Sequence, residues 1–403
     1  MPEQSALNEQ KIIKAKHRKS GNFKELLFVT GSIDIPFLAL TVALLTIGLI
    51  MLFSASYPYA YYKFNHDSYH YFTRQFIFAI LGLVAMGVMS KINYKWLKAL
   101  YIPVVAVTLL LLVIVLFYHT DLAGADTDDF KRFIPLPGGF TFQPSDLAKF
   151  AMILLFAVYI TDNYNKMKKF KYGILYPLGM IAVFCGLIVL EHHMSCTILM
   201  FFIGATMMWV GGSDWKLFAF GLAILVLAVF IVITMPGILE DYAGERIYAW
   251  LNKDFEPRGA RWQTNNSLYA IGSGGLFGVG LGNSKQKYMY VSEPQNDFIF
   301  SIVCEELGFI GATLIIILFA ALVIRGFVIA ARTQDKFASL LVIGVMAQIG
   351  IQVGLNILVV TDTIPNTGIA LPFFSYGGTS LFILLFEIGV VLSVSRKSSQ
   401  QRV

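Results

Sequence analysis

The chain has little charge and little cysteine. Only 14% of its 403 residues are charged, whereas 57% are hydrophobic. Its mean hydropathy is +0.67. A soluble domain of this length does not need so much apolar surface, so the composition excludes an ordinary soluble protein and predicts a membrane protein. The first part of the chain is polar and basic, which does not match a cleavable signal peptide.

The few cysteines and histidines argue against a disulfide framework and against a zinc site. Cys185, Cys196 and Cys304 lie in or beside apolar runs, which indicates buried apolar residues rather than paired thiols. No spacing of cysteine and histidine resembles a zinc site. His192 and His193 are adjacent, and adjacent residues do not share a helix face, so this pair is a poor metal site.

Long apolar runs dominate the sequence instead. A membrane-spanning helix needs roughly 20 apolar residues. We therefore predict an all-α polytopic membrane protein with about ten transmembrane helices, which form a single domain over residues 33–395. Residues 1–32 and 396–403 are its predicted tails. The ten predicted spans are 33–55, 70–90, 99–118, 146–161, 175–190, 195–211, 217–235, 298–324, 338–360 and 379–395.

Positive charge predicts the orientation of these spans. Lysine and arginine gather in cytoplasmic loops of membrane proteins. With ten spans and both termini in the cytoplasm, 20 of the 31 Lys and Arg residues fall on the cytoplasmic side. The net charge of +6 is thus a sign of topology in a bacterial plasma membrane and does not indicate nucleic acid. The basic segments are the N-terminal tail, 91–98, 166–171, Lys216, 325–336 and 396–402.

A long extracellular loop, residues 236–297, separates predicted helices seven and eight. Its aromatic residues and glycines indicate an ordered, partly re-entrant loop. The glycines do not follow a strand, so they are not a nucleotide-binding fingerprint. Two alternatives remain open for them: N–H groups that cradle phosphate, or close packing against a helix. The glycines are Gly272, Gly274, Gly275, Gly278, Gly280 and Gly282.

Ionisable residues at or inside the spans are the candidate functional groups. Asp297 ends the long loop and directly precedes the apolar Phe298, so it is either a functional carboxylate or a helix N-cap. Glu306, with Glu305 beside it, lies two turns into span eight and is expected to face the bundle interior. Lys149, near the outer start of span four, either snorkels to the interface or faces a cavity.

Four segments resemble the motifs of the SEDS family (shape, elongation, division and sporulation), which includes FtsW, RodA and SpoVE. The resemblance covers about residues 30–395 and favours FtsW and SpoVE over RodA. There are departures: Asp146 replaces a common glutamate, and 192–197 lacks the usual proline and glycine. The four segments are 143–149 (QPSDLAK), 267–282 (SLYAIGSGGLFGVGLG), 296–308 (NDFIFSIVCEELG) and 368–381 (GIALPFFSYGGTSL).

The resemblance implies a peptidoglycan glycosyltransferase that polymerises lipid II, the undecaprenyl-pyrophosphate-linked disaccharide-pentapeptide. It implies work with a class B penicillin-binding protein, and with other division or elongation proteins, in cell wall synthesis during cell division or sporulation. It also implies a divalent cation, Mg²⁺ or Mn²⁺. A lipid II flippase, a non-catalytic division scaffold and a secondary transporter are the alternatives.

The resemblance also assigns roles to residues. It maps the family's essential aspartate onto Asp297, which is then the general base or a ligand of the metal. Its lysine maps onto Lys149 and its buried glutamate onto Glu306. Partial burial at the span end is expected to raise the pKa of Asp297 and make it a better base. The residues predicted to bind the substrate are Arg246, Arg261, Lys285, Lys131, Arg132, Ser375 and Tyr376.

Overall fold

The computed structural model describes residues 27–118, 132–137, 140–214, 242–253 and 261–400, with a few single positions between them. Its elements are helices apart from one short antiparallel hairpin. They are α3 (Ile35–Lys63), α4 (His70–Met89), α5 (Lys95–Ala99), α6 (Tyr101–Phe117), β1 (Ile134–Leu136), β2 (Phe140–Phe142), α7 (Pro144–Asn163), η1 (Tyr164–Lys166), η2 (Lys171–Leu175), α8 (Tyr176–Leu190), α9 (Met194–Val210), α11 (Tyr242–Leu251), α12 (Trp262–Gly274), α13 (Ile299–Arg332), α14 (Lys336–Val360) and α15 (Gly378–Gln400).

The prediction of an all-α membrane protein is confirmed. Within the described residues, seven helices are long and apolar enough to cross a membrane, and α6 and α9 are shorter apolar helices. These nine correspond to nine of the ten predicted spans. The remaining one, 217–235, lies almost wholly outside the described residues, as does the start of the long loop. The largest differences are in α3, which continues to Lys63 rather than ending near residue 55, and in α13, which continues to Arg332 rather than ending near residue 324.

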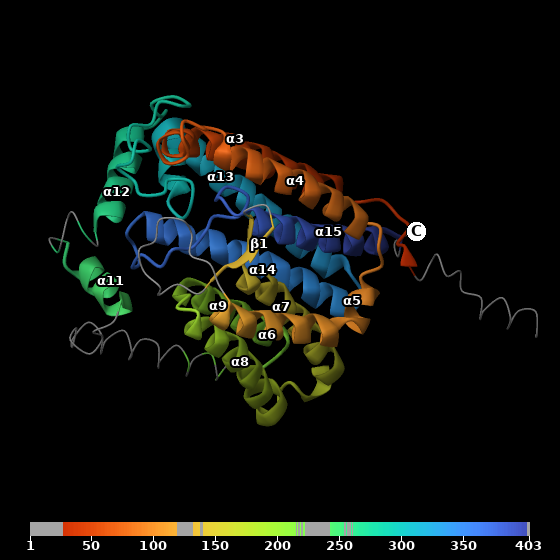
Figure 1. Ribbon diagram of the computed structural model, residues 1–403. Coiled ribbons are helices and arrows are strands. Elements are labelled where there is room, and N and C mark those ends of the chain that lie inside the picture. Colours follow the sequence, from red (N-terminus) through yellow and green to blue (C-terminus); the bar gives the residue numbers. More distant parts are fainter. Residues whose placement is uncertain are drawn as a thin grey trace, which may run out of the picture.

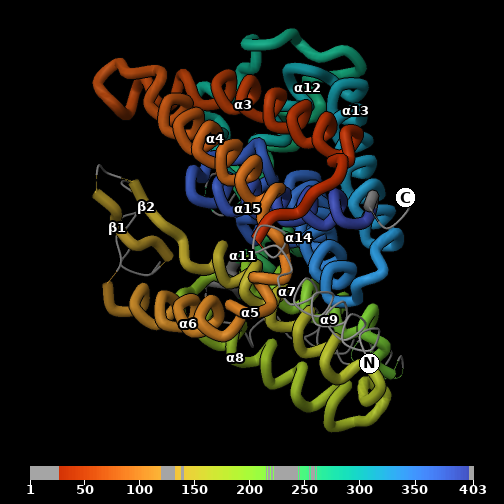
Figure 2. The backbone as a smooth tube through the Cα atoms, turned by 90° about the vertical axis from the view of Figure 1, so that its right-hand side faces the viewer, coloured from red at the N-terminus to blue at the C-terminus, as the bar shows by residue number. Residues whose placement is uncertain are grey.

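α7, α14 and α15 form the centre of the bundle. In Figures 1 and 2, α3, α4 and α13 lie on one side of them and α6, α8 and α9 on the other. Burial agrees: 78% of the most apolar window of Pro144–Lys166 is buried inside the protein, against 22% for that of His70–Met89. A helix that is buried all round is enclosed by protein, so α7 can carry polar groups inward at its ends.

The described basic segments, 91–98, 166–171, 325–336 and 396–398, gather at one end of the bundle, where carboxylates cap helices. Asp34 accepts the N–H of Phe37 at the start of α3 and a two-pronged ion pair from Arg325 on α13. Asp335 caps α14 in the same way and accepts the hydroxyl of Tyr94 at 3.1 Å. Asp at the N-terminus of a helix is stabilising. This end of the protein is therefore joined by side chains from widely separated parts of the chain.

A break in α13 is filled by the glycine-rich loop that follows α12. Gly308 has φ 68° and ψ −173°, which interrupts the helix. Non-helical backbone at this depth is tolerated only where other protein groups satisfy it. The N–H groups of Val279 and Gly280 donate to the carbonyls of Glu305 and Glu306, and the N–H groups of Phe309 and Ile310 donate to Gly275 and Leu276, all at 2.9 to 3.1 Å.

Close packing, rather than a phosphate cradle, accounts for two of the loop glycines. A Cβ atom at Gly274 would lie 2.1 Å from the Cys304 carbonyl oxygen, and one at Gly278 would lie 2.2 Å from that of Glu306. No side chain fits at either position. The glycine-rich loop thus packs directly on the backbone of α13, as the prediction of a partly re-entrant loop requires.

Candidate active site

A cavity of about 640 Å³ lies at the end of the bundle opposite the basic segments. Its wall is built from the end of α3, the starts of α4, α7, α9 and α15, the hairpin, and the two loops at 293–297 and 368–377. Concave sites with a few convergent polar groups are the usual places for ligands. The charged and histidine side chains that line it are Lys63, His70, Arg74, Arg132, Asp146, Lys149, His193, Glu293 and Asp297.

Asp297 lines this cavity and does not cap the helix that follows it. The N-cap of α13 is Phe298, which makes no side-chain cap bond. Burial raises the pKa of Asp297 to about 6, an effect that Arg132 and Arg246 oppose and that Glu293 reinforces. A carboxyl group with such a pKa is ionised at neutral pH yet accepts a proton more readily than an ordinary aspartate.

Lys149 faces the same cavity, so it does not snorkel to the interface. Its Nζ lies 2.8 Å from Oδ1 of Asp146, one turn earlier on α7, and both side chains are largely buried. Asp146 also accepts a hydrogen bond from the hydroxyl of Ser380 at the start of α15. The resembled motif has glutamate at this position. The aspartate has the same negative charge, which pairs with the lysine. The pair places a lysine in the wall of the cavity without an unbalanced buried charge.

Arg132 and His193 lie between the hairpin and α9. Arg132 donates to the carbonyl of His192 and lines the cavity, as predicted, whereas Lys131 lies outside the described residues. Nδ1 of His193 lies 3.3 Å from the hydroxyl of Ser145. Burial, with help from Arg132 and Lys149, lowers the pKa of His193 well below its usual range, so the ring is neutral. Sequence reasoning did not assign His193 a role in the site, although it belongs to the segment 192–197 that departs from the family motif.

Three cationic residues of the long loop differ in their placement. Arg246 donates to the Asn366 carbonyl at 2.8 Å, and its charge lowers the pKa of Asp297. Arg261 is 3% exposed, and its guanidinium group donates hydrogen bonds to Asp362 and to a carbonyl of α11. Lys285 is exposed. None of these three predicted substrate-binding residues lines the cavity, and only Arg246 acts on Asp297 through its charge.

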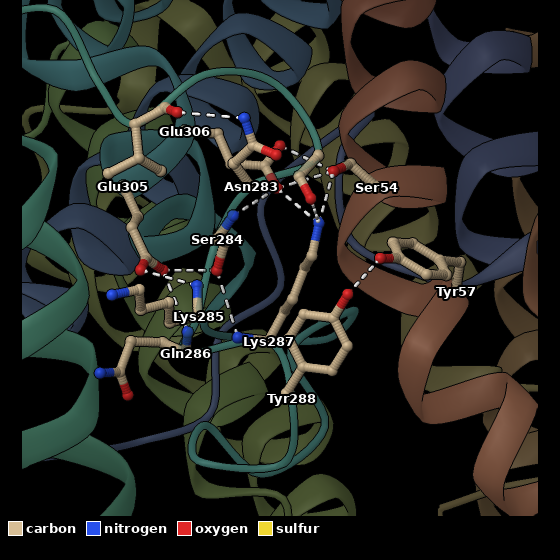
Figure 3. A network of polar contacts seen from close by, with 12 residues as sticks. Ser54, Tyr57, Asn283, Ser284, Lys285, Gln286, Lys287, Tyr288, Glu305 and Glu306 are labelled. Carbon is tan, nitrogen blue, oxygen red and sulfur yellow. Dashed lines mark hydrogen bonds and ion pairs between the residues drawn. The ribbon is translucent and has the colours of Figure 1, made fainter.

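Glu306, predicted to be catalytic, lies in a buried clamp and does not line the cavity (Figure 3). Its carboxylate accepts the hydroxyl of Ser54 on α3 and lies 2.9 Å from Nζ of Lys287, which is fully buried. Glu305 holds the same loop, because it accepts the N–H of Lys285 at 2.9 Å and the hydroxyl of Ser284. The motif was recognised correctly, but its two glutamates fasten the loop to α13 and α3.

The loop at 368–377 forms part of the cavity wall. Ser375 and Tyr376 both line the cavity, and the Tyr376 ring packs edge-on against Tyr71 with 4.8 Å between ring centroids. Arg74 on α4 lies 5.5 Å from the ring centroid of Phe140 and was missed by sequence reasoning. The signal that points to it is an arginine inside a predicted apolar span, which rarely faces lipid.

These motif residues belong to a pattern that extends beyond the site. A sequence profile for FtsW, RodA and SpoVE, described as cell cycle proteins, matches residues 36–400, which include every helix from α3 to α15. The chain belongs to the FtsW/RodA/SpoVE family.

Individual relatives of the family agree over nearly the whole chain. Stage V sporulation protein E of Bacillus subtilis is 40% identical over 369 residues, which are 91% of this chain and 97% of that protein. The probable peptidoglycan glycosyltransferase FtsW of Geobacter metallireducens is 36% identical and covers 93% of this chain and 98% of its own. A chain from a peptidoglycan synthase complex, solved to explain coordination of polymerization and crosslinking, has the same fold, with a TM-score of 0.74, 24% identity and coverage of 92% and 99%.

Proposed function

We propose that the protein is a peptidoglycan glycosyltransferase that polymerises lipid II into glycan strands. The observation that carries this proposal is a half-buried carboxyl group of raised pKa, Asp297, in a cavity that also holds Arg132 and Lys149. Such a site pairs a general base with cations for a leaving pyrophosphate. The name of the Geobacter relative, at 36% identity over almost its full length, supports the same reaction.

Asp297 is the general base in this proposal. It accepts the proton of the 4-hydroxyl group on the acceptor sugar while that oxygen bonds to the anomeric carbon of the donor. The bond from that carbon to the pyrophosphate breaks, and undecaprenyl pyrophosphate leaves with the electron pair. The anomeric configuration inverts, because the nucleophile attacks opposite the leaving group. General-base assistance of this kind contributes typically ~10²–10⁴-fold to the rate.

The leaving pyrophosphate needs positive charge around it. Arg132 and Lys149 lie on the α7 side of the cavity, while Lys63 and Arg74 line it from α3 and α4. Guanidinium groups hold phosphate oxygens in a two-pronged geometry, and lysine acts as a point charge. We assign these four side chains to the pyrophosphate groups. Ser375 and Tyr376 belong to the wall beside them.

The residues fit a divalent cation only if the substrate supplies part of its coordination. Within the part of the chain that the structure describes, no group of three or more His, Cys, Asp or Glu side chains comes together. Mg²⁺ is commonly held by one or two carboxylates together with substrate phosphates and water. In the alternative role, Asp297 would be the protein ligand of such an ion instead of the base, and Mg²⁺ or Mn²⁺ there would neutralise charge on the pyrophosphate.

The cavity faces the outside of the cell in this proposal. The basic segments at the opposite end of the bundle then lie in the cytoplasm, together with both termini, as the positive-inside rule requires. A class B penicillin-binding protein is the proposed partner that crosslinks the glycan. Identities of 40% to a stage V sporulation protein and 36% to FtsW support a role in sporulation or division rather than elongation.

The test is polymerisation of lipid II by the purified protein. The protein is reconstituted with its cognate penicillin-binding protein, whose transpeptidase is blocked, in the presence of Mg²⁺ or Mn²⁺. Glycan strands resolved on a gel support the proposal. Movement of labelled lipid II across vesicles without any strands would identify a flippase, and neither activity would identify a scaffold.

A further inference from the structure

The backbone that presents Asp297 is held at three consecutive residues. Each of the carbonyl groups of residues 295, 296 and 297 accepts a hydrogen bond from a different donor outside the segment. The donors are the N–H of Tyr376 to Gln295 at 2.8 Å, the hydroxyl of Ser375 to Asn296 at 2.9 Å, and the side-chain amide of Asn356 to Asp297 at 2.8 Å.

Asn356 makes the contact with Asp297 itself. It lies on α14 with none of its surface exposed, and its amide nitrogen donates to two carbonyls, those of Asp297 at 2.8 Å and Ile369 at 2.6 Å. One nitrogen with two N–H groups thus joins the loop that carries Asp297 to the loop at 368–377. Among side chains of similar size, only asparagine supplies both donors without a charge.

The second loop also limits the space around the carboxylate. Gly368, which precedes Ile369, has φ 70°, and a Cβ atom there would lie 2.9 Å from Oδ2 of Asp297. The position of Ile369 therefore decides how closely the loop backbone approaches the carboxyl group. Because Asn356 holds both carbonyls, it fixes the distance between this wall and Asp297.

We propose that Asn356 is a positioning residue that fixes Asp297 in its catalytic geometry by tying the carbonyls of Asp297 and Ile369 to α14. The proposal deepens the assigned function and depends on it. Asp297 lies in a loop, where no regular hydrogen-bond ladder holds it. A misplacement of about 1 Å in a catalytic group costs about 10²-fold in rate.

The test compares Asn356→Leu with Ser267→Ala. Ser267 is also fully buried and also bonds a carbonyl of α14, that of Val360 at 2.9 Å, but it has no bond to residues 295–297. We expect Asn356→Leu to lower kcat about 10²-fold with KM changed less than about threefold, because an interaction that positions the base is lost. We expect Ser267→Ala to stay within about threefold of wild type in both constants.

Two further readouts separate positioning from general damage. In Asn356→Leu the loosened carboxylate is more hydrated, so the acid limb of the pH–rate profile moves to lower pH. Hydrogen exchange of peptides covering 293–300 and 367–377 becomes faster in Asn356→Leu and is unchanged in Ser267→Ala. If Asn356→Leu fails to fold, Asn356→Ser, which keeps one donor, is expected to show an intermediate loss of kcat and an intermediate gain in exchange.

The outcomes distinguish this inference from the proposed function. Wild-type kcat and exchange in folded Asn356→Leu would overturn the role of Asn356, as would an equal loss in Ser267→Ala. Absence of product from the wild-type protein would overturn the polymerase assignment, and the exchange measurement would then decide alone whether Asn356 fixes the segment.

Discussion

At the residue scale, the chemistry depends on a carboxyl group that the protein partly removes from water. Asp297 lies at the rim of α13, and the surrounding protein raises its pKa to about 6. Burial has the largest effect on this pKa. Arg132 and Arg246 lower it, and Glu293 raises it. The pKa of this carboxyl group thereby lies between the ordinary value for aspartate, near ~3.9, and neutral pH.

This pKa predicts the pH dependence of polymerisation. A base must be unprotonated to act, so kcat/KM is expected to level off above about pH 7 and to fall about tenfold per unit below pH 6. Initial rates of lipid II polymerisation between pH 5 and 8.5 measure this. A rate that stays constant down to pH 5 would show that the group in control has an ordinary carboxyl pKa.

The same burial predicts that Asp297 costs stability at neutral pH. Because its folded-state pKa, about 6, lies above the ordinary value near ~3.9, the cost is absent below the lower value and complete above the higher one. Asp297→Asn should therefore melt at a higher temperature than wild type at pH 7.5, and the difference should shrink as the pH falls towards 5. Thermal unfolding in detergent at both pH values measures it. An equal or growing difference at pH 5 would contradict the assigned burial.

Lys287 and Glu306 offer a test of their structural assignment. Both are fully buried, and their charged atoms lie 2.9 Å apart. Removal of one partner from a buried ion pair typically costs ~3–5 kcal/mol, because the other charge is left uncompensated. We expect Glu306→Gln and Lys287→Met each to destabilise the protein by about that amount, and the double variant by less than the sum.

A double-mutant cycle on thermal or denaturant unfolding in detergent measures this coupling. The account also expects the double variant to keep activity in proportion to its folded fraction, because neither side chain lines the cavity. A folded double variant with no polymerisation would show that Glu306 contacts the reacting groups after all.

At the scale of the elements, α13 is two helical segments joined through a break that another segment completes. Four main-chain hydrogen bonds between 275–280 and 305–310 replace those that Gly308 interrupts. The segment before the break begins just after Asp297 and carries Glu305 and Glu306 near its end. The side-chain contacts of Glu305 and Glu306 in Figure 3 and the main-chain hydrogen bonds across the break therefore hold the same short piece of helix.

This arrangement predicts that Gly308 cannot be replaced. Its backbone angles lie in a region that is essentially restricted to glycine, and a Cβ atom would lie 2.2 Å from the nitrogen of Gly278. Gly308→Ala is expected to cost about 2–5 kcal/mol or to prevent folding. Gly354→Ala on α14, where a Cβ atom meets nothing within 4 Å, is the matched control and should melt like wild type. Equal melting of the two variants would contradict the described break.

At the scale of the whole molecule, the sequence predicted what depends on local composition. Spans follow from apolar length, and nine of the ten lie within the described residues as helices. The position of Asp297 at a span end was also predictable. Which charges meet was not, because that depends on contacts between distant segments. Arg261 reaches Asp362, and Glu306 reaches Lys287 and Ser54, so neither faces the cavity.

The same limit explains the residues that were missed. Arg74 and His193 reach the site only because α4 and α9 begin at the same side of the bundle as α7. Asn356 lies about 60 residues from Asp297 along the chain, and its role depends on two bonds that join α14 to two separate loops. Single residues inside apolar spans carry no periodic signal, so only the assembled bundle shows what they contact.

The most direct measurement compares wild type with Asp297→Asn in lipid II polymerisation. Each is purified with the same penicillin-binding protein, its transpeptidase blocked, and assayed in Mg²⁺ or Mn²⁺ after unfolding curves have shown both proteins to be folded. The account predicts glycan strands from wild type and at least ~10²-fold fewer from the variant, because the amide cannot accept the proton. Equal yields of strands from the two proteins would contradict it.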